Sequence, residues 1–467
     1  MVPARPRLAH VTLTKCEGES TTAATGVSFA EEQLWLAEQR DPTAHPFLEC
    51  KPSMSLAARL EGPLDIEALE ASLNGVIRDQ EVLRSIFFSR GGRLLRQYEP
   101  EGLVNIAKVE LDAMPEDSAS QRLERLLADH AQEAFDLRSA PLMRAILVTL
   151  GGDRHVLSVT LPHIVFDRWS KRVLALELRR RYGARLTGDT AQVPPPPAQY
   201  RDYVKWQRQR LEGSLGHQLR AYWFTRLGDL TDLSLPRDKG DHHRRATTRS
   251  ATVRFVIAAP QVARLRTLSR RFRVTLATLT LAIVQLFLHR VTSQQDIAVG
   301  VPLSDRRRPE FVPLIGLFMN LVVVRTSITS DLTFRHVVDR VRRSLVDACR
   351  HQDMPFGYLA RTLERPAPLY RVVFSFMPAV PASSVALPGI RATPLWVDVE
   401  PPSLADLSVR VLSTANGMAW RLAYRADWYS PALVHRFAEQ LQNLVSGVLD
   451  DCDKLVDAYE LDASIPR

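Results

Sequence analysis

Cysteine is scarce in this chain, and its cysteines lie far apart. The 467 residues include only four, Cys16, Cys50, Cys349 and Cys452, and no two of them form a Cys-x-x-Cys pair. Disulfide frameworks and zinc sites use numerous or closely spaced cysteines, so we expect neither here. The cysteine content therefore predicts a protein of the reducing cytoplasm with no bound metal.

Long apolar stretches are also lacking. Residues 1–15 contain none, so we expect no signal peptide. The longest apolar run, residues 274–288, includes Gln285 and several threonines, and it is shorter than the roughly 20 residues that a membrane-spanning helix needs. We therefore expect a buried helix over this run and no membrane partner.

Two common catalytic motifs are missing. The chain has no Gly-x-Ser-x-Gly sequence, which argues against the nucleophile elbow of serine hydrolases. It has no glycine-rich loop ending in Lys-Ser or Lys-Thr, so nothing supports nucleotide binding. We expect no cofactor on the chain.

The chain is rich in apolar residues and carries an excess of positive charge. Hydrophobic residues make up 45% of it and charged residues 24%, which suits a globular protein with more than one core. The net charge of +9 favours an acidic partner, such as nucleic acid or an acidic carrier protein, although an arginine-rich genome would give the same charge. The basic clusters at 179–181, 242–245 and 306–308 are not interleaved with aromatic residues, so we expect no nucleic-acid binding.

Residue periodicity predicts a mixed α/β fold. Apolar residues recur at helical spacing over 64–86, 118–133, 169–186, 199–223, 274–290, 334–352 and 431–449. Alternating or β-branched runs predict strands over 142–150, 155–161, 250–257, 297–302, 321–327, 370–376 and 408–412, with a hairpin between the first two.

A run of four prolines at 194–197 divides the chain, because such a run neither continues a helix nor sits inside a sheet. The predicted segments are a loose leader over 1–26, an N-terminal lobe over 27–193, a proline-rich linker and crossover helix over 194–235, and a C-terminal lobe over 236–467. The mixture of helices and strands in the chain suggests two α/β sandwiches in series.

One histidine lies where a reactive group is expected. His163 and Asp167 form a His-x-x-x-Asp pair between a strand predicted to end at Leu161 and a helix predicted to begin near Trp169. A side chain there projects from a rigid sheet edge into the cleft between the lobes. A satisfied core histidine and an N-cap aspartate would have the same spacing, so both alternatives stay open.

The same spacing occurs at His45…Glu49 and at His435…Glu439, and the latter lies within a predicted helix as an ordinary surface pair. Neither lies between a buried strand and a helix start. A single histidine without a nucleophilic partner indicates direct transfer between two bound substrates and not a covalent acyl-enzyme.

Several separated segments resemble, in the right order, the core motifs of the condensation domains of nonribosomal peptide synthetases. The segments are Val27-Ser-Phe-Ala-Glu-Glu-Gln-Leu-Trp35, Leu83-Arg-Ser-Ile-Phe87, Leu161-Pro-His-Ile-Val-Phe-Asp-Arg-Trp-Ser170, Gln199-Tyr-Arg-Asp-Tyr-Val-Lys-Trp-Gln207, Ile297-Ala-Val-Gly-Val-Pro302, Ile315-Gly-Leu-Phe-Met-Asn320, His351-Gln-Asp-Met-Pro-Phe356 and Tyr370-Arg-Val-Val-Phe374. Together they cover nearly the whole chain, and their ordered co-occurrence is highly specific.

The resemblance implies an α/β fold of two chloramphenicol-acetyltransferase-like lobes in a V-shaped arrangement, with an active-site tunnel between them. A donor thioester would enter on the phosphopantetheine arm of an acyl- or peptidyl-carrier protein, and this arm is substrate, not cofactor. A small-molecule or carrier-bound amine or alcohol acceptor would enter at the other end. The chain holds one condensation unit and little else, so we expect a free-standing enzyme that meets its carrier protein in trans.

The resemblance makes His163 the catalytic histidine and Asp167 a structural aspartate that pairs with an arginine, for which Arg306 is the candidate. The chain departs from the family motif at Pro162, which replaces a first histidine, and at Arg168, which replaces a glycine. Arg168 is expected either to contact an anionic group of a substrate or to lie on the surface of the first helical turn. The further candidates for the tunnel are Trp169, Ser170, Asn320 and Ser375.

The predicted function is transfer of an acyl or aminoacyl group from a carrier-protein thioester to an amine or hydroxyl, forming an amide or ester in natural-product biosynthesis. One alternative is an acyl-CoA or polyketide-associated O- or N-acyltransferase of the same superfamily. The other is a catalytically degenerate condensation-like domain that recruits a tailoring enzyme, which Pro162 and Arg168 would suit.

Overall fold

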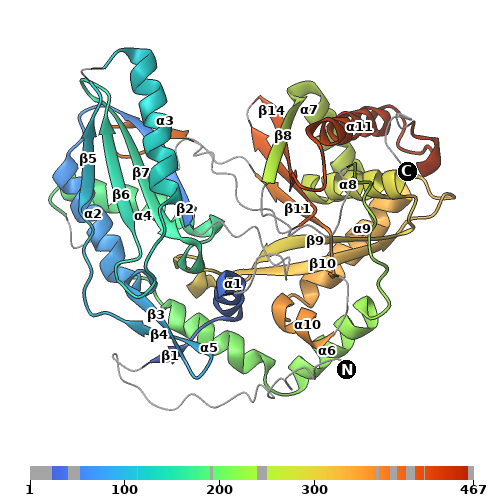
Figure 1. The fold of residues 1–467 in the computed structure, drawn as a ribbon, viewed down its shortest axis with the longest axis horizontal. Helices are drawn as coiled ribbons and strands as arrows, with labels where there is room; N and C mark the ends of the chain where they lie inside the picture. Colours follow the sequence, from blue (N-terminus) through green and yellow to red (C-terminus); the bar gives the residue numbers. More distant parts are fainter. Residues whose placement is uncertain are drawn as a thin grey trace, which may run out of the picture.

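The protein forms two α/β lobes that meet at a common base and splay apart above it (Figure 1). The computed structural model describes residues 24–39, 53–112, 114–189, 193–238, 250–363, 368–378, 386–395, 405–414 and 416–460. The N-terminal half of the chain builds most of one lobe and the C-terminal half builds the other. This is the V-shaped pair of α/β lobes that the sequence predicts.

The N-terminal lobe is built on a five-stranded sheet in the order β12-β2-β7-β6-β5. Its strands are β2 (Ser53–Glu61), β5 (Ile106–Glu110), β6 (Arg144–Thr149), β7 (Arg154–Pro162) and β12 (Arg391–Leu395). Helices α2 (Ile66–Asp79) and α4 (Arg168–Leu186) pack on one face and α3 (Glu116–Gln132) on the other. Side chains alternate along β6, so Leu147 joins the core beneath α2 and α4 whereas Val148 joins the core beneath α3.

The predicted hairpin of this lobe is confirmed, since β6 and β7 pair antiparallel with Thr149 opposite His155. The helix predicted over 64–86 is wrong at its C-terminal end, because α2 stops earlier and strand β3 (Ser85–Arg90) follows. Gln80 leaves the helical conformation, with φ of −107° and ψ of 89°. Its amide instead bonds to the distant backbone, donating to the Pro313 carbonyl over 3.1 Å and accepting from the Ile315 amide over 2.9 Å.

The C-terminal lobe is built on a six-stranded sheet in the order β10-β9-β11-β13-β14-β8. Its strands are β8 (Ser250–Ala258), β9 (Asp296–Ser304), β10 (Met319–Ser327), β11 (Val372–Met377), β13 (Leu407–Thr414) and β14 (Gly417–Arg425). Helices α7 (Ala259–Arg271), α8 (Leu276–Thr292), α9 (Phe334–Arg350) and α11 (Pro431–Asp450) pack on the side away from the N-terminal lobe (Figure 1).

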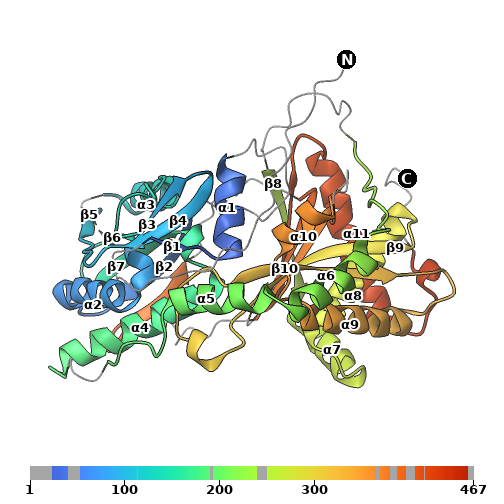
Figure 2. The same ribbon diagram turned by 90° about the horizontal axis from the view of Figure 1, so that it is seen from below.

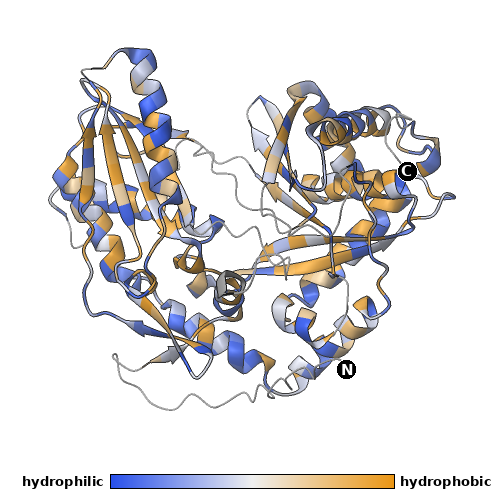
Figure 3. Ribbon diagram, viewed as in Figure 1, coloured by the Kyte–Doolittle hydropathy of each residue, from blue (hydrophilic) through white to orange (hydrophobic). Residues whose placement is uncertain are grey.

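Helix α8 is the buried helix that the apolar run predicts. Its residues from Leu279 to Leu288 are each no more than 1% exposed, and Figure 3 shows that hydrophobic residues dominate it. Within the described residues, no single helix has the length and hydropathy of a membrane span. Helices α7 and α8 meet those criteria only as a pair, across a bend of 100°.

The base joins the two lobes. It contains α1 (Phe29–Gln39), α5 (Tyr200–Leu211), α6 (Ser214–Leu227), α10 (Phe356–Thr362) and a small sheet in the order β1-β4-β3, with β1 (Thr25–Gly26) and β4 (Arg93–Tyr98). Figure 2 shows α5 and α6 running one after the other from beneath the N-terminal lobe to beneath the C-terminal lobe. Two consecutive helices, interrupted at Glu212 and Gly213, therefore connect the lobes along the base.

Two segments from the C-terminal half of the chain lie in the N-terminal lobe. Strand β12 pairs antiparallel with β2 at the edge of the five-stranded sheet. The connection between β9 and β10 places Phe311, Leu314 and Phe318 in the same core as α2 and α4. The domain boundaries drawn at residues 193 and 235 stay predictions, and they do not separate the lobes cleanly along the chain.

Candidate functional site at the junction of the lobes

His163 lies directly after β7, at the point where the chain turns into α4. Strand β7 ends at Pro162, one 3₁₀ turn (His163–Val165) follows, and Asp167 then begins the helix. The apolar residues of the turn are buried, which fixes the turn against the core. The imidazole is itself only 7% exposed. The strand end and the helix start therefore hold the histidine on rigid elements, as expected from its sequence context.

A hydrogen bond to the backbone selects the tautomer of His163. Its Nδ1 lies 2.8 Å from the carbonyl oxygen of Phe166, an acceptor, so Nδ1 carries the proton and donates it. The other ring nitrogen, Nε2, then carries the lone pair. Among the described residues, no hydrogen bond to Nε2 is present. The histidine is thus prepared to accept a proton through Nε2.

Burial keeps this imidazole neutral. Desolvation lowers the pKa of His163 below its ordinary value of 6.5, and the nearby cation of Lys171 acts in the same direction. The hydrogen bond to Phe166 and the charge of Asp167 oppose the shift without cancelling it. At neutral pH the side chain is therefore the free base.

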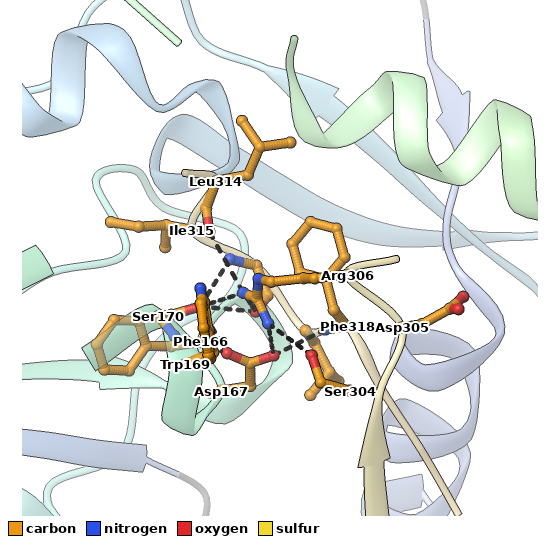
Figure 4. A network of polar contacts seen from close by, with 12 residues as sticks. Phe166, Asp167, Trp169, Ser170, Ser304, Asp305, Arg306, Leu314, Ile315 and Phe318 are labelled. Carbon is orange, nitrogen blue, oxygen red and sulfur yellow. Dashed lines mark hydrogen bonds and ion pairs between the residues drawn. The ribbon is translucent and has the colours of Figure 1, made fainter. Parts of the chain in front are cut away.

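Asp167 caps α4 and pairs with Arg306 at the same time. Its Oδ1 accepts from the Ser170 backbone amide and from the Ser170 hydroxyl, each over 2.8 Å. Its Oδ2 accepts from Arg306 Nη1 over 2.5 Å and from the Phe318 amide over 3.1 Å (Figure 4). The predicted Asp167–Arg306 pair is therefore present, and the N-cap alternative is present beside it.

The charge of Asp167 is well compensated. Burial alone would raise the pKa of this carboxyl, but the Arg306 guanidinium and the hydrogen bonds from Ser170 outweigh burial and hold the pKa below its ordinary value. The two side chains are 7% and 3% exposed, respectively. Removing either partner would leave a buried charge without compensation.

Arg306 connects the C-terminal half of the chain to this helix start. Its Nη2 donates to Ser170 Oγ over 2.9 Å and is directed at the carbonyls of Leu314 and Gly316, at 3.3 and 3.4 Å. Its guanidinium lies 4.0 Å from the ring centroid of Phe318. We call the set Asp167, Ser170, Arg306, Gly316 and Phe318 the latch, because it fixes the β9–β10 connection to the start of α4 (Figure 4).

Of the remaining candidates, Trp169 and Ser170 belong to the latch region. Trp169 is 37% exposed and donates from Nε1 to the Val312 carbonyl over 2.9 Å. Ser170 is fully buried, and its hydroxyl bonds to Asp167, Arg306 and Gly316. Both side chains therefore make structural contacts. For Ser170, whose hydroxyl makes three of them, this argues against the predicted substrate role.

Asn320 and Ser375 do not join the latch. The Asn320 amide donates to the carbonyls of Gln352 and Met354 over 2.6 and 2.7 Å, and its oxygen accepts from the Phe356 amide over 3.1 Å. Asn320 therefore fixes the loop before α10, so its side chain is also committed to the fold. Ser375 is partly exposed on β11, and its role stays a prediction.

The other histidine pairs differ from His163 in their surroundings. His435 and Glu439 are both exposed on α11, as expected for a surface pair. His45…Glu49 lies outside the described residues. Within the described part of the chain, no group of three or more His, Cys, Asp or Glu side chains could hold a metal ion.

The sequence did not point to the aromatic cluster behind the latch. Tyr200 donates its hydroxyl to the Leu317 carbonyl over 2.7 Å, and the same oxygen lies 3.0 Å from Ser28 Oγ. These contacts tie α5, the β9–β10 connection and the residue before α1 together. Tyr203 donates to Asp305 over 3.1 Å. These tyrosines lie in the Gln199–Gln207 motif, so the motif itself was the available signal, but its partners are too distant in sequence to be identified.

Comparison with known proteins identifies the family to which this two-lobed α/β chain belongs. The Condensation domain family model matches residues 25–464. The chain is 34% identical over 90% of its length to a linear gramicidin synthase polypeptide from Brevibacillus parabrevis, of which it spans 5%. The chain belongs to the condensation-domain family, whose members include parts of nonribosomal peptide synthetases.

Solved structures agree with this assignment. The X-domain from teicoplanin biosynthesis superposes with a TM-score of 0.82 at 25% identity, covering 97% of this chain and all of that one. A complex of the X-domain with OxyB from teicoplanin biosynthesis superposes with a TM-score of 0.79, also at 25% identity, covering 96% of this chain and all of that one. The predicted family and fold are confirmed.

Proposed function

We propose that this condensation domain transfers an acyl or aminoacyl group from the phosphopantetheine thioester of a carrier protein to an amine or hydroxyl acceptor. Condensation domains generally form amide bonds, which gives the reaction class. The observation that carries the proposal is the tautomer of His163, whose Nδ1 is held by Phe166 while Nε2 remains basic.

The proposed reaction uses His163 as the group that moves a proton. The acceptor nitrogen or oxygen attacks the thioester carbonyl, and Nε2 takes the proton that the acceptor loses. The new C–N or C–O bond forms, the C–S bond breaks, and the proton passes from His163 to the departing sulfur, which leaves as the thiol of the phosphopantetheine arm. His163 ends the cycle neutral, as it began.

The nucleophile determines how much this base contributes. An α-amine has a pKa near 8, so about a tenth of it is neutral at pH 7, at a cost of about 1.4 kcal/mol. A hydroxyl stays protonated until it attacks, so it depends far more on a base. We therefore expect His163→Ala to reduce ester formation by about 100-fold or more and amide formation by less.

The experiment mixes the protein with a loaded carrier protein and a panel of amines and alcohols, and detects product by intact mass. The matched control is His435→Ala, which removes an exposed histidine of α11 and should leave both products unchanged. Coenzyme A thioesters are offered in parallel, because preference for them would assign an acyl-CoA-dependent transferase. Equal losses for amine and alcohol acceptors would contradict the expected difference between ester and amide formation.

A second candidate function is recruitment of a tailoring enzyme without catalysis. Two observations favour it: Arg168 stands where the family motif has glycine, and the X-domain, which superposes on this chain, is solved in complex with OxyB. Under this reading the loaded-carrier assay gives no product with any acceptor, and His163→Ala changes nothing. Product that depends on His163 would exclude it.

A further inference from the structure

The outer face of α4 exposes apolar side chains that a surface helix normally buries. Of the ten large apolar residues exposed in the described part of the chain, three lie on this one helix: Trp169, Leu176 and Leu186. A fourth, Val312 of the β9–β10 connection, lies beside Trp169, whose Nε1 donates to the Val312 carbonyl. Exposed apolar side chains that gather in one place mark a surface where another molecule binds.

The same helix carries an excess of positive charge. It contains seven basic residues and one acidic residue, Glu177, whose carboxylate is already paired with Arg180 over 3.1 Å and with Arg181 over 3.0 Å. The exposed cations Arg172 and Arg179 alternate with the apolar residues at steps of three and four, so all of them lie along one side of the helix. We call the set Trp169, Arg172, Leu176, Arg179 and Leu186 the α4 stripe.

A basic helix of the other lobe shows how an ordinary charged surface differs. Helix α9 also exposes arginines and one large apolar side chain, Val346. Its arginines are interspersed with aspartates, as in the Arg350–Asp347 pair. In the α4 stripe, by contrast, Arg172 lies over an aromatic ring, with its guanidinium 5.2 Å from the ring centroid of Trp169. The positive charge of the stripe is therefore not offset by acidic residues of its own helix.

The α4 stripe begins close to the proposed base. Trp169 is the second residue of α4, and it follows His163 by six residues. Arg168, the first residue of the helix, is exposed, as the surface alternative for it predicts. From there α4 runs along the lower edge of the N-terminal lobe in Figure 2. A partner bound along the stripe would therefore be held on the helix that begins at the candidate site.

We propose that the α4 stripe, with Val312 beside its first residue, is the docking surface for the acidic carrier protein that supplies the thioester. Tryptophan and arginine are enriched at protein interfaces, and the exposed leucines add apolar area. The uncompensated arginines select a partner whose surface is acidic. The inference rests on the proposed function, because the carrier protein is the donor substrate of that reaction.

Kinetics with two thioester donors test this surface. Leu176→Glu and Arg172→Glu each place a negative charge in the stripe, and each variant is assayed with the loaded carrier protein and with the same acyl group on a small thiol. We expect the ratio of kcat/KM for the carrier protein to kcat/KM for the small thioester to fall by about 10-fold, through KM, as for residues at the centre of an interface. An unchanged ratio in both variants would overturn the proposal.

The matched controls are Val346→Glu and Arg343→Glu. Both residues are exposed on α9, three positions apart, so the controls make the same two kinds of change on a helix of the other lobe. The ratio should stay nearly constant in both. A fall as large as in the stripe variants would overturn the proposal, because the effect would then follow from net charge and not from a docking surface.

A second measurement does not depend on turnover. The photoreactive residue p-benzoylphenylalanine replaces Leu176 in one protein and Val346 in another, and mass spectrometry detects adducts with the carrier protein after irradiation. We expect an adduct from position 176 and none from position 346; no adduct from position 176 would overturn the proposal. An adduct without any condensation product would keep the docking surface and reject the proposed reaction. Product formation that neither stripe variant affects would keep the reaction and reject the surface.

A basic helix with exposed tryptophan and leucine also has the composition of a helix that binds anionic membranes. Vesicles of phosphatidylglycerol and phosphatidylcholine test that occupant by sedimentation. We expect the wild-type protein to stay in the supernatant. Sedimentation with the vesicles that Leu176→Glu abolishes would overturn the proposal and assign the stripe to a lipid surface.

Discussion

The carboxylate of Asp167 both caps α4 and pairs with Arg306, so its removal should lower the stability of the protein. Asp167→Ala deletes the cap of α4 and leaves the Arg306 guanidinium, whose side chain is 3% exposed, without its counter-ion. We expect the free energy of unfolding to fall by about 3–5 kcal/mol, measured by urea denaturation. The control is Asp450→Ala in the exposed Arg264–Asp450 pair, which should cost less than about 1 kcal/mol. Equal losses in the two variants would show that the latch adds nothing.

The protonation of His163 predicts a pH profile. Because desolvation lowers the pKa of His163 below 6.5, the base form persists as the pH falls and is lost only when the pH passes the lowered pKa. With a hydroxyl acceptor, the acidic limb of kcat/KM should therefore lie below pH 6.5. An acidic limb above this value, measured with the same acceptor and a loaded carrier protein, would contradict the assignment of His163 as the base.

At the scale of single residues, part of the site could be predicted from a local motif and part only from the family resemblance. His163 and Asp167 are four residues apart, so a local motif was sufficient to find them. Arg306 lies 139 residues from Asp167 along the chain, and only the family resemblance singled it out. The positions of Ser170 and Asn320 could not be predicted, because each depends on backbone groups of distant segments that no spacing rule identifies.

Among the structural elements, the β9–β10 connection depends on a close approach that only glycine permits. A Cβ added at Gly316 would lie 2.2 Å from the Tyr200 ring. Gly316→Ala should therefore displace the connection, destabilise the protein by about 1–3 kcal/mol and weaken the latch. Thermal unfolding and the condensation assay both report the effect.

The control for this prediction is Gly26→Ala in β1. A Cβ at that position would meet only Arg208 Nε, at an ordinary 3.6 Å. We expect little change in stability. If Gly316→Ala were as stable as Gly26→Ala, this would contradict the close packing of the β9–β10 connection against Tyr200.

A helix or strand could be predicted from the sequence when the residues that determine it lie close together in the chain. Helix α8 and the β6–β7 hairpin follow from continuous apolar runs and a glycine turn, and both were predicted. Strand β12 contains Pro394 and pairs with β2, more than 300 residues earlier in the chain. No local pattern in the sequence therefore predicts this strand. The end of α2 was missed because Gln80 bonds to the β9–β10 connection rather than continuing the helix.

For the whole molecule, the net positive charge bears on how the chain would encounter the carrier protein of the proposed reaction. A net charge of +9 should speed the encounter with an acidic carrier protein. We expect kcat/KM for the loaded carrier protein to fall several-fold between low and physiological salt, while kcat stays nearly constant. A small thioester that bypasses the carrier protein is the control and should show no such dependence. A kcat/KM for the carrier protein that does not change with salt would show that charge does not steer the encounter.

The position of β12 also constrains when the protein can fold. The edge strand of the N-terminal sheet and part of that lobe's core come from residues 311–318 and 391–395. During synthesis, residues 53–162 leave the ribosome before residues 311–318 and 391–395 are made. Until then, β2 is an unpaired edge of the N-terminal sheet. The N-terminal lobe thus becomes complete only after residues 391–395 are translated, and in the meantime that edge is open to chaperones or to pairing with other nascent chains.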